Sequence, residues 1–377
     1  MAATMSWARL RELASFRAEK GCAISLYVNL DPSVTPTAAE ASARINSLLD
    51  RAVRGTDRND LTHAQRVALK GDLERIRSFF QLEFDRDGAR GFAVFSAALD
   101  NFWRPVPLSA AVPDTIQIDD EFFLTPLVPL VGRGDGALVA VVGRERGDLY
   151  RLRGGRLEEV ADRTEEQPGR HDQGGWSQAR YQRHIENLVA GHLRDVADAL
   201  DHFVRRRGVP VVVVSSEETR AEFAEILSNG ARKAVVGWTQ AEAHAGPSEL
   251  LAPALRVLDA WHESKEAEVV ERWREEAGRD GRAASGWAQT LEAASDGRVE
   301  LLLYREGTAH GACRCPACGR LSVAGGKCPL DGTELEHRDA GLDLAIHQTL
   351  AHGGSVWAVT TRPDLGAVQG VGALLRY

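Results

Sequence analysis

The pattern of apolar and polar positions divides the chain into three successive blocks. In the first block, short alternating runs predict strands, and longer runs with apolar residues at helical spacing predict helices. Its predicted elements are a strand at 23–29, helices at 38–53 and 62–84, and strands at 91–97 and 102–108. A segment rich in proline and aspartate, 113–120, is expected to be an irregular crossing that leads out of the block. We predict an N-terminal α/β domain at residues 1–128.

The second block begins with hairpin patterning and continues with strand–helix–strand order. Glycine-containing turns separate the first strand runs, and a long amphipathic helix follows the polar loop at 163–175. Its predicted elements are strands at 137–143, 149–153 and 156–160, the long helix, a strand at 209–214, a helix at 218–227, a strand at 231–236 and a helix at 248–277. We predict a middle α/β domain at 129–277 that carries a tip loop at 163–178.

The third block is short and contains a cysteine-rich segment at 310–332. Its predicted elements are a helix at 286–294, a strand at 299–304, a helix at 341–353, and strands at 355–359 and 370–377. We predict a small C-terminal α/β domain at 278–377 with the cysteine segment as an insert. The expected fold class is therefore α/β, in three domains.

Length and composition indicate a soluble globular protein. The 377 residues exceed what one core supports, and 44% hydrophobic with 27% charged residues is a globular balance. The longest apolar stretches fall short of the roughly 18 residues that a membrane span needs, and the first twenty residues lack the apolar core of a signal peptide. We expect a cytoplasmic protein without a membrane partner. The net charge of −8 disfavours nucleic-acid contacts over the whole surface but permits a local basic patch.

The polar loop of the second block is followed by a locally basic helix. Gly174 and Gly175 give the loop conformational freedom, and Trp176 is its one large apolar residue. Between positions 170 and 194 there are four arginines against two acids. The side chains of Arg170, Arg180, Arg183 and His184 are candidates for RNA phosphate contacts, since the last three lie away from the apolar helix face. The alternative interpretation is a solvated loop and helix surface.

Two stretches of the chain resemble the archaeal and eukaryotic class-I peptide release factor and Pelota superfamily. Residues 174–181, GGWSQARY, match the superfamily's tip in their glycines, small residues and Arg-aromatic pair. Residues 370–377, GVGALLRY, resemble the closing strand of the third domain. The resemblance implies a bacterial member with a three-domain release-factor-like architecture. It also implies a tRNA-mimicking protein of the ribosomal A site, whose tip reaches the peptidyl transferase centre.

The tip departs from the superfamily at one position. In release factors, glutamine directly follows the two glycines and promotes hydrolysis of the ester between peptide and tRNA. Here Trp176 stands in that place, and Gln178 lies two residues later. Tryptophan has a single donor and no acceptor, so it cannot replace an amide that orients water, but it can stack on a nucleobase. The implied partners are ribosomal RNA, P-site tRNA and a delivering translational GTPase.

Three functional hypotheses therefore stand. The first is an A-site factor in ribosome rescue or hibernation, which occupies the centre without catalysis. The second is a peptidyl-tRNA hydrolase that uses Gln178, and whether the chain is an enzyme stays open. The third is an RNA or protein interaction module unrelated to ribosomes. The stop-codon-reading motifs of true release factors are not recognised in residues 1–131, so we do not expect stop-codon decoding.

Four of the five cysteines lie close together near the C-terminus, which indicates a metal site. The stretch Cys315-Pro-Ala-Cys318-Gly has the form of a zinc knuckle, and Cys328-Pro-Leu-Asp331-Gly repeats it with aspartate at the last ligand position. Cys313 or His310 is the alternative fourth ligand. Zinc-binding inserts in the third domain also occur in the superfamily. We expect structural zinc in a zinc-ribbon-like insert; the alternative is a knuckle that no longer holds metal.

Other motifs are weaker candidates for function. Ser215 and Ser216 follow an apolar run without a G-x-S-x-G turn, and no phosphate-binding G-x-x-x-x-G-K-[ST] loop is present. We therefore expect no GTPase activity of the chain itself. His347 and His352, on or near the end of the predicted helix at 341–353, are expected to have capping or surface roles.

Overall fold

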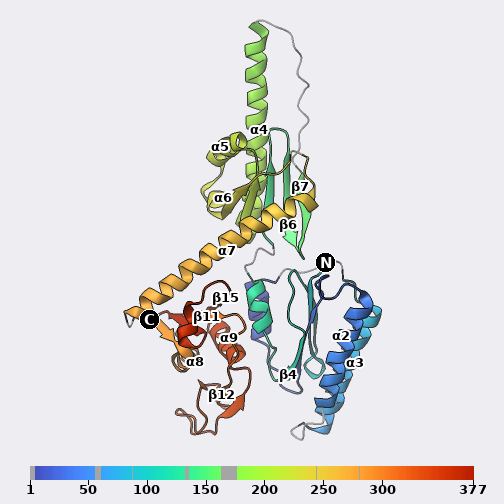
Figure 1. Cartoon of the computed structure of the whole chain (residues 1–377), viewed down its shortest axis with the longest axis vertical. Helices are drawn as coiled ribbons and strands as arrows, with labels where there is room; N and C mark the ends of the chain where they lie inside the picture. The colour runs from blue at the N-terminus through green and yellow to red at the C-terminus, as the bar shows by residue number, and fades with distance from the viewer. Residues whose placement is uncertain are drawn as a thin grey trace. The chain divides into compact units, whose positions relative to one another are not determined.

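The computed structural model describes residues 5–55, 61–86, 88–131, 136–162, 176–242, 244–279 and 281–377 (Figure 1). The chain divides into two compact units. Unit 1 combines Met1–Gly132 with Glu263–Tyr377, and unit 2 is Arg133–His262. The first and third predicted domains thus both contribute to unit 1, and the three-domain division stays a prediction. The architecture is mixed α/β, as expected.

The N-terminal part of unit 1 is an antiparallel sheet with two helices packed on one face. Its elements are α1 (Trp7–Ala14), β1 (Ala23–Asn29), α2 (Ala38–Gly55), α3 (His63–Leu82), β2 (Gly91–Ala97), η1 (Ala98–Asp100), β3 (Phe102–Leu108), β4 (Thr115–Asp119) and η2 (Thr125–Leu130). The strand order is β3-β2-β1-β4. Thr62 and Gln65 form a capping box that starts α3.

Strand β1 is buried on both faces, which accounts for its nearly continuous apolar sequence. Leu26 and its neighbours two residues away on either side pack against α2 and α3. Tyr27 points to the opposite face, into a core shared with α1 and with the C-terminal part of the chain. Strand β4 was missed by the sequence analysis, which expected an irregular crossing there. Its residues are half-buried or exposed, so its apolar signal is weak.

The C-terminal part of unit 1 is a second sheet covered by helices. Its elements are β10 (Ala283–Ser285), α8 (Gly286–Ser295), β11 (Val299–Arg305), α9 (Gly341–Ala351), β15 (Ser355–Val359), η3 (Asp364–Val368) and β16 (Val371–Leu375). The strand order is β10-β16-β11-β15, with β11 and β15 parallel. The strand predicted at 370–377 is therefore β16, in the interior of this sheet. A small three-stranded sheet is inserted before α9: β12 (Ala312–Arg314), β13 (Leu321–Ser322) and β14 (Glu336–Arg338), in the order β13-β12-β14.

Unit 2 is a five-stranded sheet between helices. Its elements are β5 (Leu138–Val142), β6 (Gly147–Arg153), β7 (Arg156–Asp162), α4 (Trp176–Arg207), β8 (Val211–Val214), α5 (Glu217–Ile226), α6 (Asn229–Ala234), β9 (Val235–Thr239) and the first half of α7 (Pro247–Gly278). The strand order is β7-β6-β5-β8-β9; the first three strands form the predicted meander, and β5, β8 and β9 run parallel. Helix α4 packs on one face and α7 on the other.

The strand predicted at 231–236 is wrong over most of its length. Residues 231–234 belong to α6, and only the last two positions lie in β9. The Ser228 hydroxyl accepts a hydrogen bond from the Ala231 amide and caps this short helix. Across the part of the chain that the structure describes, no helix combines the length and apolar character that a membrane span requires.

Candidate functional site

The cysteine segment places four potential metal ligands together. The ligand atoms of Cys315, Cys318, Cys328 and Asp331 all lie within 4.8 Å of one another. The sulfurs of Cys318 and Cys328 are 3.5 Å apart, and Cys315 Sγ is 3.4 Å from the nearer oxygen of Asp331. A tetrahedral zinc ion with bonds of about 2.0–2.3 Å has ligand atoms about 3.5–3.8 Å apart. The two short separations match this geometry, and the cluster as a whole is small enough that its four residues could hold one metal ion.

Two turns of the same construction present these ligands. In the first turn, the Gly319 amide donates to the Cys315 carbonyl at 2.9 Å; in the second, the Gly332 amide donates to the Cys328 carbonyl at 2.9 Å. Both glycines have positive φ, +78° and +77°, which glycine adopts without a steric penalty. Asp331 thus occupies in the second turn the place that Cys318 occupies in the first.

The carboxylate of Asp331 is held in its ionised form, the form that can ligate a cation. The backbone amide of Thr333 donates to Asp331 Oδ1 at 2.9 Å, and this hydrogen bond lowers the pKa of Asp331 below its ordinary value. The side chain is therefore ionised at neutral pH. Cys315 and Cys328 are buried, whereas Cys318 and Asp331 are exposed, so the cluster lies at the surface of the insert.

The two alternative ligands lie outside the cluster. Cys313 Sγ is 4.0 Å from His337 Nδ1, its cross-strand neighbour on β14. The imidazole of His310 stacks on Trp287, with ring centroids 4.5 Å apart and an interplanar angle of 17°. The structure therefore groups Asp331 with the three cysteines and gives both alternatives other partners.

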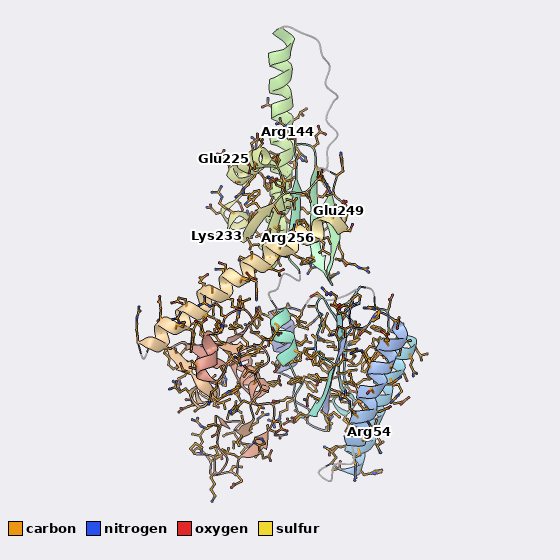
Figure 2. All side chains as sticks on the ribbon, in the orientation of Figure 1. Arg54, Arg144, Glu225, Lys233, Glu249 and Arg256 are labelled. Carbon is orange, nitrogen blue, oxygen red and sulfur yellow. The ribbon has the colours of Figure 1, made fainter. Side chains whose placement is uncertain are left out.

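The predicted tip falls largely outside the described residues. Arg170, Gly174 and Gly175 are not among them. Trp176 is the first residue of α4, and Gln178, Arg180, Arg183 and His184 follow in its first turns, but the structure does not describe the side chains of 176–186. Their roles remain predictions. On the described surface of unit 2, side chains of both signs are interspersed, among them Arg144, Glu225, Lys233, Glu249 and Arg256 (Figure 2).

A buried polar junction, which the sequence analysis did not identify, joins the two parts of unit 1. Asp343 Oδ1 accepts hydrogen bonds from the amides of Leu124 and Thr125, at 2.8 and 2.9 Å. Arg314 and Glu121 form a two-pronged ion pair at 2.8 and 2.9 Å. These contacts link η2 and the segment after β4 to α9 and β12, and so join the N-terminal part of unit 1 to its C-terminal part.

His347 lies at the centre of this junction, so its predicted surface role is wrong. It is only 6% exposed; its Nε2 is 2.7 Å from the Phe122 carbonyl and its Nδ1 is 3.2 Å from the Ala14 carbonyl. Because both acceptors are carbonyl oxygens, both ring nitrogens must carry a proton. Burial alone would lower the pKa of His347, but the contacts with the carboxylates of Asp343 and Glu121 and with the Phe122 carbonyl raise it to about 9. The sequence does contain one sign of this buried contact: Asp343 and His347 are spaced i, i+4 on the predicted helix, so their side chains can meet.

Comparisons with known proteins agree with the resemblance seen in the sequence. The model of the family described as "Bacterial archaeo-eukaryotic release factor family 10" matches residues 123–259. Peptide chain release factor subunit 1 of Archaeoglobus fulgidus is 24% identical over 98% of this chain and 96% of its own length. The protein of the same name from Thermococcus kodakarensis is also 24% identical, with the same coverage.

The solved structures that align with this chain are more distant in sequence. A crystal structure of the archaeal translation termination factor aRF1 aligns over 99% of both chains with 17% identity and a TM-score of 0.27. Archaeoglobus fulgidus Pelota aligns over 78% of this chain and 82% of its own, with 16% identity and a TM-score of 0.33. At these TM-scores the structural likeness adds no separate argument. The family match over residues 123–259 and the similarity to archaeal relatives over most of the chain support membership of the superfamily of archaeal and eukaryotic release factors and Pelota.

Proposed function

We propose that this chain is a translation factor that binds the ribosomal A site as a tRNA-shaped protein, in ribosome rescue or hibernation. The observation that carries the proposal is the similarity to peptide chain release factor subunit 1, which extends over 98% of the chain. The alignment covers 98% of this chain and 96% of the relative, which supports a role for the whole chain rather than for one domain. Action on ribosomes also implies a cytoplasmic protein.

The tip and the start of α4 are the proposed contact with the large ribosomal subunit. Gly174, Gly175 and Trp176 would enter the peptidyl transferase centre. Arg180, Arg183 and His184 are spaced i, i+3 and i+4 on α4, so they share one side of the helix. With Arg170 they would neutralise phosphates of ribosomal RNA, and Trp176 would stack on a base of ribosomal RNA or P-site tRNA.

Occupation without hydrolysis is the favoured mode, because Trp176 cannot orient a water molecule as an amide does. The alternative is peptide release by Gln178. A release assay on ribosomes that carry peptidyl-tRNA separates the two. The non-catalytic mode predicts that the parent protein releases no peptide and that Trp176→Gln gains release. A parent that releases peptide, and loses this activity in Gln178→Ala, would instead establish the hydrolase.

We propose zinc as the ion of the cysteine cluster, in a structural role. Three thiolates and one carboxylate would complete the four-ligand set that structural zinc takes, which would leave no position open for a substrate. The ion would hold the two turns of the insert together, which its small sheet cannot do with so few strands. A translational GTPase that delivers the protein to the ribosome is a further proposed partner.

A further inference from the structure

The three cysteines of the metal cluster differ in their access to solvent. Cys315 is fully buried and Cys328 is 3% exposed, whereas Cys318 is exposed. A dissolved reagent that attacks sulfur therefore meets Cys318 first. Because Asp331 takes the fourth place in the cluster, three sulfurs are present and only two of them can pair with each other.

The three sulfurs also differ in their neighbours. The sulfur of Cys318 lies 3.5 Å from the sulfur of Cys328, which belongs to the other turn. The sulfur of Cys315 instead lies beside the carboxylate of Asp331, at 3.4 and 3.6 Å from its two oxygens. A disulfide bond is about 2.05 Å long, so the sulfurs of Cys318 and Cys328 need to approach by only about 1.5 Å. The geometry favours this pair over one that involves Cys315.

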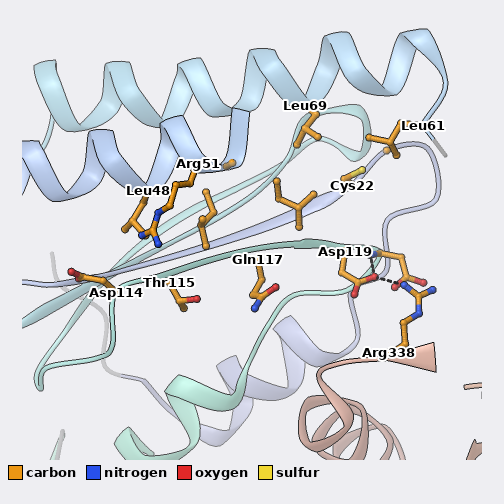
Figure 3. A pocket seen from close by; sticks show the side chains of 15 residues that line it. Cys22, Leu48, Arg51, Leu61, Leu69, Asp114, Thr115, Gln117, Asp119 and Arg338 are labelled. Atoms are coloured by element: carbon orange, nitrogen blue, oxygen red, sulfur yellow. Dashed lines mark hydrogen bonds and ion pairs between the residues drawn. The ribbon is translucent and has the colours of Figure 1, made fainter. Parts of the chain in front are cut away.

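The other two cysteines of the chain serve as internal references. The sulfur of Cys313 lies 4.0 Å from Nδ1 of His337 and is not part of the cluster. Cys22 lines a cavity beside the N-terminal sheet, together with Leu61 and Leu69, and the described residues of that lining include no second cysteine (Figure 3). Neither thiol therefore has a sulfur partner comparable to the Cys318 and Cys328 pair.

We propose that Cys318 and Cys328 form a reversible disulfide when the protein meets a peroxide, and that this disulfide then takes the place of the zinc ion as the link between the two turns. The release of zinc rests on the zinc site proposed above. The choice of the two cysteines rests only on their exposure and on the separation of their sulfurs.

The reaction has two steps and consumes one peroxide. The thiolate of Cys318 attacks one oxygen of hydrogen peroxide, the O–O bond breaks and hydroxide leaves, which gives a sulfenic acid. The thiolate of Cys328 then attacks the Cys318 sulfur, the S–S bond forms and a second hydroxide leaves. The two sulfurs lose two electrons and the peroxide gains them. Two protons from solvent convert the hydroxides to water.

The disulfide has opposite effects on the metal and on the insert. It removes two thiolates from the cluster and leaves Cys315 and Asp331, which are fewer than the four ligands that structural zinc takes, so the ion is released. It also joins the turn that carries Cys318 to the turn that carries Cys328, so the two turns stay linked. Reduction by a thiol restores both thiolates, and the cluster can then bind zinc again.

The test is performed on the full-length protein. Zinc is first measured by elemental analysis, an equimolar amount of hydrogen peroxide is added, and free zinc is followed with a chromogenic chelator. The protein is then denatured, alkylated and digested with trypsin, which releases residues 315–320 and 328–338 as separate peptides. We expect these peptides to be cross-linked, with the alkyl group on Cys315, and the chain to be about 2 Da lighter than its reduced form. Cys22 and Cys313 should be alkylated as in the untreated protein.

A pair of serine variants provides the matched comparison. Cys318→Ser should lose the cross-link between the two peptides, because the exposed sulfur is absent. Cys313→Ser, which removes the thiol of a cysteine outside the cluster, should form the cross-link and release zinc as the wild type does. Treatment of the oxidised wild type with dithiothreitol and zinc should restore the original metal content.

Several outcomes would overturn the proposal. They are a disulfide between Cys315 and Cys318, oxidation of Cys318 to sulfinic acid without a cross-link, and oxidation of Cys22 or Cys313 at the same rate as Cys318. Retention of zinc in the cross-linked protein would also overturn it. A purified protein that contains no zinc would refute the zinc site instead, and the peptide map would still decide whether Cys318 and Cys328 pair.

Discussion

When His347 is replaced by glutamine, the free energy of unfolding of unit 1 should depend much less on pH between about pH 6 and pH 9. In the wild type the imidazolium is only 6% exposed and joins α9 to the carbonyls of Ala14 and Phe122. Glutamine is neutral throughout this range, so it removes the titration while it keeps a polar side chain. The carboxylates of Asp343 and Glu121 then lose their buried cationic neighbour.

The magnitude follows from the pKa of His347. Its folded value of about 9 lies above the ordinary value of 6.5, so folding favours the protonated form. The stabilisation is fully present below about pH 6.5 and is lost as the pH rises through about 9. A rise of this size corresponds to roughly 3 kcal/mol. The free energy of unfolding of the wild type, relative to that of His347→Gln, should therefore fall by about this amount across the interval.

The assay is equilibrium urea unfolding followed by tryptophan fluorescence at several pH values. Other titrating groups cancel in the difference between wild type and variant. The control is His352→Gln, a change at the exposed C-cap of the same helix, which should not alter the pH dependence. A wild type whose advantage over His347→Gln stays constant from pH 6 to pH 9 would refute a buried imidazolium at the junction.

Three further changes test other parts of the account. Asp331→Ala should abolish binding of about one zinc ion per chain, measured by elemental analysis, because the tetrahedron loses its fourth ligand, whereas Cys313→Ser should retain the metal. His192 is 2% exposed with no hydrogen-bond partner for either ring nitrogen among the described residues, so His192→Leu should raise the free energy of unfolding by roughly 1–2 kcal/mol in thermal melts. The buried carboxylate of Glu266 accepts five hydrogen bonds from residues 360–362, so Glu266→Ala should lower the urea midpoint and cost roughly 3 kcal/mol or more.

Each of these expectations has a contrary outcome. Loss of zinc in Cys313→Ser with retention in Asp331→Ala would reassign the fourth ligand. A destabilised His192→Leu variant would show that the imidazole is satisfied in solution. A Glu266→Ala protein as stable as the wild type would show that the turn at 360–362 does not hold α7.

The fold could be predicted from the sequence where burial leaves a periodic signal. Strand β1, α3 and the meander of unit 2 were recognised because their apolar positions repeat with the period of their own secondary structure. Strand β4 was missed because an edge strand buries little, and its Pro113 and Asp120 flanks resemble those of a loop. The helix α6 was mistaken for a strand because six residues are too few for helical periodicity to show.

The same distinction applies to the functional residues. The grouping of Cys315, Cys318, Cys328 and Asp331 could be predicted because these four residues lie within seventeen positions, in two turns of recognisable sequence. The junction around His347 could not, because Arg314 and Glu121 are separated by 193 positions and meet only in the folded chain.

The most direct test of the proposed function is co-sedimentation of the purified protein with 70S ribosomes, either vacant or carrying A-site tRNA. An A-site factor predicts binding to vacant ribosomes at moderate salt and loss of that binding when tRNA occupies the A site. Failure to bind either form would contradict the proposal, and the chain would then be an RNA or protein interaction module without a ribosomal role.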